Sequence, residues 1–171
     1  MSAPYPVGKI ANAFLEIAWR DNGRVSPMKL QKLVYLAHGL NLALYGKPLI
    51  DARVEAWKYG PVIAPLYYET RHYGSSSINN PITLESSALF SDDLDEDVGL
   101  DDSTRSLLLQ VWEAYGGISA VGLSSLTHQS ELPEGAPWHK TWHENGGRER
   151  WGTDIPDELI EKSFKDLLID N

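Results

Sequence analysis

The stretch "SPMKLQKLVYLAHGLNLALYGKP", residues 26–48, carries the strongest helix pattern in this chain. Ser26 is a good helix cap because its hydroxyl can accept a hydrogen bond from the first turn, and Pro27 is tolerated in that turn. Gly46 and Pro48 then stop the helix. Between these signals an apolar stripe at helical spacing consists of Leu30, Leu33, Val34, Ala37, Leu40 and Leu44. The stretch therefore predicts a long helix that buries one face.

The rest of the chain predicts further helices and little sheet. Residues 53–59, "RVEAWKY", alternate in character and are enriched in β-branched and aromatic types, which predicts a short strand. We expect this strand to pair with residues 48–51 or with a later extended segment, and to end at Gly60-Pro61. Helical patterns with their caps occupy 8–20, 64–74, 102–116, 119–128 and 156–169, and one or two helical turns fall within 137–147. The predicted fold is mainly α, a single compact domain over 1–171 with about six helices and one or two short β-strands.

The composition is that of a folded protein in a reducing compartment. The chain has 171 residues, of which 42% are hydrophobic, enough to bury one core. It contains no cysteine, which excludes disulfides and thiolate zinc sites. The sequence has no secretory pattern at its start and no run near the ~20 apolar residues that span a bilayer. We therefore expect a cytoplasmic protein without membrane insertion.

The negative charge of this chain is concentrated in one segment. The formal net charge is −9, and seven of the acids lie within "DDLDEDVGLDD", residues 92–102; outside it, 15 basic face 17 acidic residues, a net charge of −2. Such a chain has no basic stripe, so we expect no direct nucleic-acid binding.

The acidic segment lies in a predicted irregular connection, 75–102. Its Asp93, Asp95 and Asp97 suggest a calcium loop, but Val98 stands where the turn needs glycine and Thr104 where the bidentate acid belongs. A solvated acidic loop is favoured, and a polyanion mimic for a basic partner is the alternative.

Catalytic patterns are weak in this sequence. His139 and His143 are four residues apart and could share a helical face as zinc ligands, with Glu144 or His128 as the only candidates for a third ligand. The arrangement that couples two histidines to a general base on one helix is missing. Ser119 in "GISAVG" fits a helix cap better than a nucleophile, because the next glycine is three positions on. We therefore expect no enzyme, cofactor or metal, and keep a metal-dependent hydrolase as the less favoured alternative.

Four segments in order resemble the Panacea domain, the SocA-like and GepA-like family of bacterial and phage proteins. They are "PMKLQKLVYLAHGLNLALYGKPLI" (27–50), "EAWKYGPVIAPLYYETRHYG" (55–74), "LSSLTHQ" (123–129) and "PWHKTW" (137–142). The resemblance covers about 8–145. It implies a mostly helical antitoxin that neutralises a protein toxin, encoded by the adjacent gene, through direct binding. It also implies an alternative role as a proteolytic adaptor that delivers a toxin to a Clp-type protease. Some relatives carry an additional DNA-binding helix-turn-helix module, which this chain lacks.

Residues off the apolar stripe and on the aromatic strand are the predicted partner-binding site. Part of the long helix faces away from its stripe, and aromatic rings beside a rigid turn make effective interface anchors. The candidates are Lys29, Lys32, Tyr35, His38, Trp57, Tyr59, Gly60, Pro61 and Tyr67.

Structural or solvent-exposed roles are the alternative for seven of these nine candidates. Trp57 and Tyr59 could clamp the strand on the long helix, with Gly60 present only for its backbone. Tyr35 and His38 could close hydrogen bonds in the core. Lys29 and Lys32 could belong to a solvated face, and Trp138 and Trp142 are expected to fasten the C-terminal turn to the core.

Overall fold

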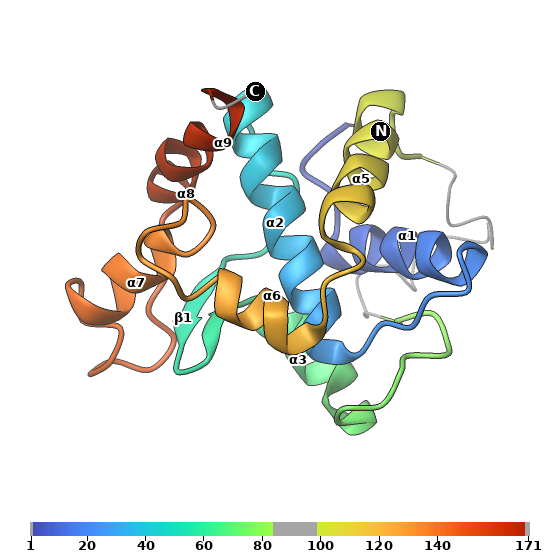
Figure 1. Ribbon diagram of the computed structural model, residues 1–171, viewed down its shortest axis with the longest axis horizontal. Coiled ribbons are helices and arrows are strands. Elements are labelled where there is room, and N and C mark those ends of the chain that lie inside the picture. Colours follow the sequence, from blue (N-terminus) through green and yellow to red (C-terminus); the bar gives the residue numbers. More distant parts are fainter. Residues whose placement is uncertain (1, 84–98, 170–171) are drawn as a thin grey trace.

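The long helix α2 (Pro27–Tyr45) is the central element of the computed structural model, which describes residues 2–83 and 99–169 (Figure 1). Its caps are those the sequence predicts: the Ser26 side chain accepts from the Lys29 N–H, and Gly46 ends the helix with φ of 66°. Helices α1, α5, α6 and α8 all pack against it. Because neighbours surround α2, its polar residues Gln31, Lys32 and His38 are buried as Leu30, Leu33 and Leu36 are, whereas Leu44 of the predicted stripe is 45% exposed. The expectation of one buried face is therefore wrong for most of its length.

The remaining helices enclose α2 and confirm a compact, mainly α fold. Asp101 and Ser119 cap α5 and α6 by accepting from the third following N–H, at Thr104 and Gly122. The predicted C-terminal helix is divided at Lys165 into two. The elements are α1 (Val7–Arg20), α3 (Ala64–Thr70), the 3₁₀ turn η1 (Arg71–Tyr73), α5 (Asp102–Tyr115), α6 (Ala120–Leu126), α7 (Ala136–His143), α8 (Asp157–Phe164) and α9 (Asp166–Ile169).

Most of the acidic segment lies outside the described residues. This holds for Asp93, Asp95 and Asp97, so the prediction of a solvated acidic loop within 75–102 stays a prediction. Within the two described ranges, no helix combines the length and the apolar content needed to cross a membrane.

The sheet is a two-stranded hairpin, which corrects the prediction of one strand over 53–59. Strands β1 (Glu55–Trp57) and β2 (Gly60–Val62) pair antiparallel, with Trp57 opposite Gly60. The two residues between them form the turn, and Gly60 begins the second strand with φ of +119°, a backbone conformation that side chains other than glycine rarely adopt. The glycine that was expected to break the strand therefore allows the chain to return.

Both edges of the hairpin are occupied. On the β1 side, the Ala56 N–H donates to the Thr153 carbonyl at 2.8 Å, so residues 153–155 are the later extended segment that the sequence allowed. On the β2 side, Pro61 has no N–H, and its carbonyl accepts from the Lys32 ammonium at 2.9 Å. Neither edge offers a free row of backbone groups to another strand.

Two buried amides join distant parts of the chain by imitating a backbone pair. Gln31 donates to the Ile63 carbonyl and accepts from the Ile63 N–H, each at 2.9 Å. Asn12 does the same with Ile82, at 2.9 and 2.7 Å. Each side chain therefore satisfies both hydrogen-bonding groups of a residue that has no strand partner there.

Replacing Gln31 with leucine is expected to lower the free energy of unfolding by about 2–4 kcal/mol, because the buried Ile63 N–H and carbonyl both lose their partner. Urea denaturation monitored by circular dichroism measures the change. Gln110→Leu on the exposed side of α5 is the matched control and is expected to change stability by less than about 0.5 kcal/mol. Equal effects of the two substitutions would contradict the role given to Gln31.

Candidate functional site

Three of the predicted site residues on α2 lie in the core. Lys32, Tyr35 and His38 are at most 3% exposed. The Tyr35 hydroxyl donates to the Glu134 carbonyl at 3.3 Å, and burial raises its pKa. These side chains do not present a surface to a partner, and the alternative of hydrogen bonding within the core describes what Tyr35 and His38 do.

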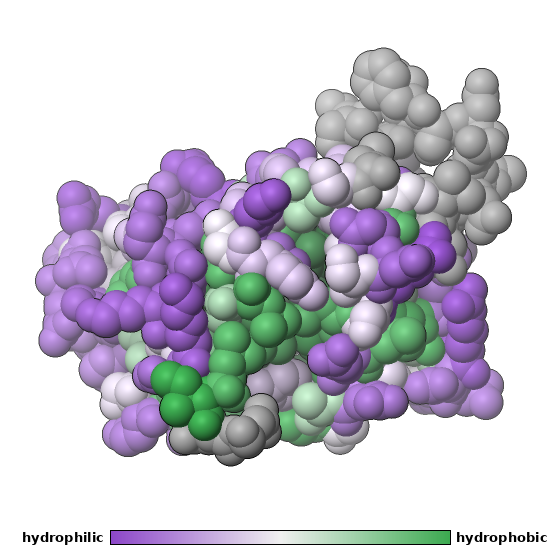
Figure 2. All heavy atoms as spheres, turned by 90° about the horizontal axis from the view of Figure 1, so that it is seen from above, coloured by the Kyte–Doolittle hydropathy of each residue, from purple (hydrophilic) through white to green (hydrophobic). Residues whose placement is uncertain are grey.

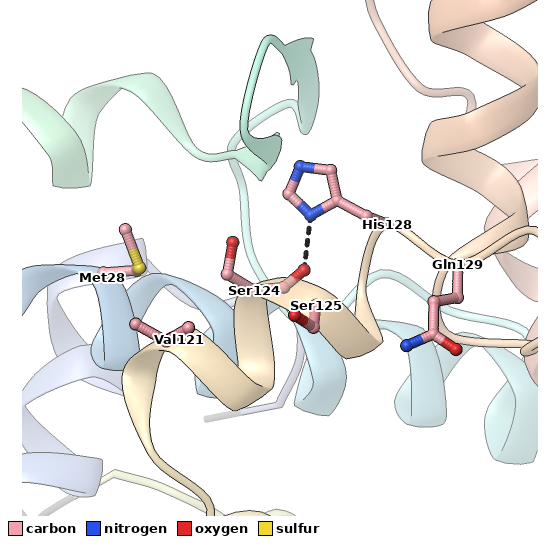
Figure 3. Close-up of a pocket in the computed structure, with 6 residues that line it drawn as sticks. All are labelled: Met28, Val121, Ser124, Ser125, His128 and Gln129. Carbon is pink, nitrogen blue, oxygen red and sulfur yellow. Dashed lines mark hydrogen bonds between the residues drawn. The ribbon is translucent and has the colours of Figure 1, made fainter.

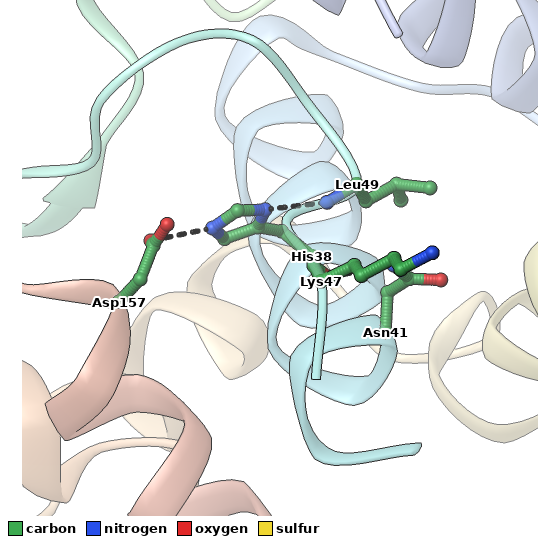
Figure 4. Close-up of polar contacts among 5 residues, drawn as sticks. All are labelled: His38, Asn41, Lys47, Leu49 and Asp157. Carbon is green, nitrogen blue, oxygen red and sulfur yellow. Dashed lines mark hydrogen bonds and ion pairs between the residues drawn. The ribbon is translucent and has the colours of Figure 1, made fainter. Parts of the chain in front are cut away.

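His38 links three parts of the fold (Figure 4). Its Nδ1 accepts from the Leu49 N–H at 3.3 Å, so in the neutral ring the proton is on Nε2, which lies 2.9 Å from the Asp157 carboxylate in the first turn of α8. Asn41, one turn further along α2, donates to the Lys47 carbonyl at 2.8 Å. His38 therefore joins α2 to α8 and to the Leu49 backbone inside the protein, and it does not contact a partner.

Lys32 holds the β-hairpin against α2 through a hydrogen bond to strand β2. Its burial lowers the pKa from 10.5 to about 7, and its ammonium donates to the Pro61 carbonyl. A Cβ at Gly60 would lie 2.8 Å from the Lys32 nitrogen and 3.0 Å from Cε1 of His128, so only glycine fits between them. Gly60 and Pro61 are buried and shape the turn.

Lys29 is half-buried and engaged within the chain. It donates to the Gly116 carbonyl at 2.5 Å, just beyond the end of α5, and its ammonium lies 5.6 Å from the centroid of the Trp112 ring. Partial desolvation lowers its pKa. Lys29 therefore secures α5 to α2.

The aromatic candidates remain at the surface and form a cluster. We define the aromatic cluster as Trp57, Tyr67, Tyr68 and Trp151. The ring centroid of Trp57 lies 4.9 Å from that of Tyr67, 6.4 Å from that of Tyr68 and 4.6 Å from that of Trp151. Trp151 is 78% exposed, and Tyr59, in the hairpin turn, is 67% exposed.

Tyr68 and Trp151 were missed in the sequence, although each left a signal. Tyr68 follows Tyr67 directly in a helix of seven residues, and two successive positions on a helix do not share one face. Trp151 follows "RER" and precedes Gly152, a polar setting for the largest side chain. Its meeting with Trp57, 94 positions earlier, had no sequence signal.

The hairpin and α7 hold Trp57 in place. The indole N–H of the buried Trp138 donates to the Trp57 carbonyl at 2.7 Å, and the Trp138 ring stacks on Trp142 with centroids 5.7 Å apart. Ser124 of α6 donates to the Tyr59 carbonyl at 3.4 Å. The rings therefore project from a supported backbone, which limits the entropy that a partner must remove on binding.

A pocket of about 390 Å³ lies beside the hairpin turn and is lined by Met28, Val121, Ser124, Ser125, His128 and Gln129 (Figure 3). The Nδ1 of His128 faces the backbone carbonyl of Ser124. The hydroxyl of Ser124 is instead directed to the Tyr59 carbonyl. The pocket thus holds hydroxyls and an imidazole without the hydroxyl-to-imidazole hydrogen bond of an activated nucleophile.

The histidine pair of α7 is close but has no further ligands. The ring centroids of His139 and His143 are 4.4 Å apart, and the Arg148 guanidinium lies 3.1 Å from Nδ1 of His143. Desolvation, with the charges of His139 and Arg148, lowers the pKa of His143. Across 2–83 and 99–169, no three or more His, Asp or Glu side chains are grouped to hold a metal ion.

A second apolar surface lies at the other end of the molecule. Seen from above, hydrophobic side chains gather across the middle of this face and beside the C-terminal end of the described chain (Figure 2). The last turns of α2 and α9 carry exposed Leu44, Leu168 and Ile169. These aliphatic side chains lack the polar handle of tyrosine and tryptophan, so the aromatic cluster is the stronger candidate for specific binding.

Comparisons with known proteins connect these features to a family. The sequence model of the family described as "Antitoxin SocA-like, Panacea domain" matches residues 30–133, which include the hairpin and α3. A curated protein, Antitoxin SocA of Caulobacter vibrioides (strain NA1000 / CB15N), is 30% identical over 165 residues, which cover 91% of this chain and 80% of that protein. No solved structure matches this chain with statistical significance.

Proposed function

The chain belongs to the antitoxin SocA-like, Panacea domain family, and from this premise we propose that it neutralises a protein toxin by binding it directly in the cytoplasm. Family membership supports the antitoxin role. The toxin is proposed to be the product of the adjacent gene, and binding is proposed to be stoichiometric, without turnover or cofactor.

The proposal of direct binding is supported by the aromatic cluster together with Tyr59 of the hairpin turn, which is 67% exposed. Rings of this size bury 150–250 Å² each in an interface and are enriched among the residues that dominate binding energy. Here Trp57, Tyr67 and Tyr59 project from the hairpin and α3, which are held by Lys32, Trp138 and Gln31. We propose that these three rings are the anchors, and that the buried members of the predicted site act by fixing the hairpin.

Tyr59→Ala and Tyr67→Ala are each expected to weaken binding of the adjacent gene's product by about 10- to 100-fold, because each removes an exposed anchor. The melting temperature is expected to stay nearly unchanged for Tyr59→Ala, since that side chain is 67% exposed, and to fall only modestly for Tyr67→Ala, whose ring is 38% exposed and packs on Trp57. Titration calorimetry after co-purification measures binding, and growth during co-expression measures neutralisation. Tyr45→Ala is the control, because Tyr45 at the end of α2 is 52% exposed, a value between those of Tyr59 and Tyr67. Loss of binding in Tyr45→Ala alone would move the interface to the opposite end of the molecule.

The same co-expression separates direct neutralisation from delivery to a protease. A stable complex on size exclusion, with full protection in cells that lack Clp proteases, is expected for direct neutralisation. Protection that disappears in those cells would instead support the adaptor role.

A further inference from the structure

The indole N–H of Trp57 has no hydrogen-bond partner among the described residues, although its nitrogen is shielded from solvent. A buried donor without an acceptor is costly, and native structures rarely retain one without a reason. Across the described chain, no hydrogen bond reaches the hydroxyls of Tyr67 and Tyr68 or the indole N–H of Trp151 either. The aromatic cluster therefore presents four groups that can donate, and no acceptor among the described residues, the two tyrosine hydroxyls included, pairs with the buried Trp57 N–H.

Trp151 is the member of the cluster that can leave most easily. Its ring leans on Trp57 at a tilt of 40° and is 78% exposed, so little besides the Trp57 contact holds it. It is followed by Gly152, whose φ of +71° marks a turn. Displacing this one ring costs an aromatic contact and uncovers more of Trp57.

The backbone and charged groups around the aromatic cluster indicate which chemical groups a bound partner must carry. Strand addition is closed to a partner because residues 153–155 and Lys32 occupy the two edges of the hairpin. Within residues 53–73 the basic residues are Arg53, Lys58 and Arg71; Arg53 is ion-paired with Asp154 at 3.2 Å, which leaves Lys58 and Arg71 as the cations that flank the cluster. Both of these cations sit over exposed rings, Lys58 at 5.3 Å from the Tyr59 centroid and Arg71 at 5.3 Å from that of Tyr68. A partner with oxygen acceptors, such as carboxylates, would satisfy both the unpaired donors and the flanking cations.

We propose that the toxin binds this cluster through an extended acidic segment, which displaces the Trp151 ring and places an oxygen acceptor on the Trp57 indole N–H. Lys58 and Arg71 meet the carboxylates of that segment on either side. The inference rests on the proposed function, since it names the chemistry by which the bound toxin is recognised.

Two substitutions test the displacement, with the adjacent gene's product as the probe. Trp57→Phe keeps a ring and removes the N–H, and is expected to weaken binding about five- to tenfold. Trp151→Ala removes the ring that must move, and is expected to tighten binding about two- to tenfold. Trp19→Phe on α1 is the control: it deletes an indole N–H that donates to the Ile78 carbonyl within the chain, and it is expected to bind as the unsubstituted protein does. Unchanged binding by Trp57→Phe, or unchanged or weaker binding by Trp151→Ala, would overturn the displacement.

A spectroscopic measurement reports on the same hydrogen bond in the unsubstituted protein, and Trp57→Phe serves only to assign the signal. Of the six tryptophan indole signals in a ¹⁵N-labelled sample, the one absent from Trp57→Phe is expected to move downfield on complex formation. If that signal does not move when the complex has formed, the toxin does not place an acceptor on the Trp57 indole N–H.

Charge reversal tests the acidic occupant. The double variant Lys58→Glu/Arg71→Glu is expected to bind at least tenfold more weakly, and addition of salt is expected to weaken the unsubstituted complex. Unchanged binding by the double variant would contradict the proposal that the toxin binds through an acidic segment. If the unsubstituted protein forms no complex at all, the proposed function fails; if it binds but these variants behave as controls, only this inference fails.

Discussion

Phe164→Ala is expected to lower the free energy of unfolding by about 3–5 kcal/mol, a large effect for a single substitution. Phe164 is fully buried at the crossing of α8 and α2, and its ring packs edge-on against Tyr35 with centroids 5.6 Å apart. The ring fills the space that Gly39 leaves open on α2. Its loss creates a cavity that neighbouring helices cannot close without moving α2.

The same crossing reverses the usual effect of glycine in a helix. Gly39→Ala would ordinarily stabilise a helix by about 1 kcal/mol, but here the added Cβ would lie 2.4–2.6 Å from three ring carbons of Phe164. Gly39→Ala is therefore expected to cost about 1–3 kcal/mol in the unsubstituted protein and to be neutral or stabilising when combined with Phe164→Ala. Denaturant unfolding of the four proteins in this cycle measures the coupling.

Gly117→Ala serves as the control for the cycle, because nothing lies within 4 Å of a Cβ at that position. Its effect is expected to be small and independent of residue 164. Additive effects of Gly39→Ala and Phe164→Ala would show that the ring does not occupy the space over Gly39.

The second large effect is a dependence of stability on pH that comes from Lys32. Burial lowers its pKa to about 7 in the folded protein, while the unfolded value is near 10.5. Between these values the unfolded chain binds more protons than the folded one, so stability rises with pH. The penalty for burying the charge is fully present below pH 7 and fades above it. From pH 7 to 9.5 the gain is expected to be about 3 kcal/mol.

Comparison with Lys32→Met isolates this contribution. The difference in unfolding free energy between the unsubstituted protein and Lys32→Met is expected to shift with pH in favour of the unsubstituted protein. Lys47→Met removes an exposed lysine and is expected to leave the pH dependence unchanged. The series stops at pH 9.5 because burial also raises the pKa values of Tyr35 and Tyr115, which lowers stability above about pH 10. Parallel curves for Lys32→Met and Lys47→Met would contradict a depressed pKa.

Local signals in the sequence were sufficient for the class of fold. Ser26 and Gly46 bound α2, and Asp101 and Ser119 cap their helices, because a cap depends on only a few neighbouring residues. The resemblance to the Panacea family is likewise confirmed by the family match over 30–133, which includes residues of the first three quoted segments and ends before the fourth, at 137–142.

Long-range placement was not readable from the same signals. The apolar stripe of α2 gave no indication that α6 and α8 would also cover the side bearing Lys32 and His38. A polar residue within a helical sequence is predicted to be exposed unless its hydrogen-bond partner is known. The partner of Lys32 is Pro61 and that of His38 is Asp157. The aromatic cluster was half visible: Trp57 and Tyr67 were predicted partner-binding residues, but Trp151 reaches them only through the pairing of residues 153–155 with β1.

The fastening of α2 to α8 also has a consequence in time. His38 and Asp157 are separated by 119 positions, and α2 packs more extensively against α8 than against any other element. A ribosome adding about 5–20 residues per second needs roughly 6–24 s to cover that distance. Throughout this interval the nascent chain carries its longest helix without the element that covers it. Each new molecule can therefore complete this packing only after α8 has been translated, so the folded protein appears at least that interval after the synthesis of α2.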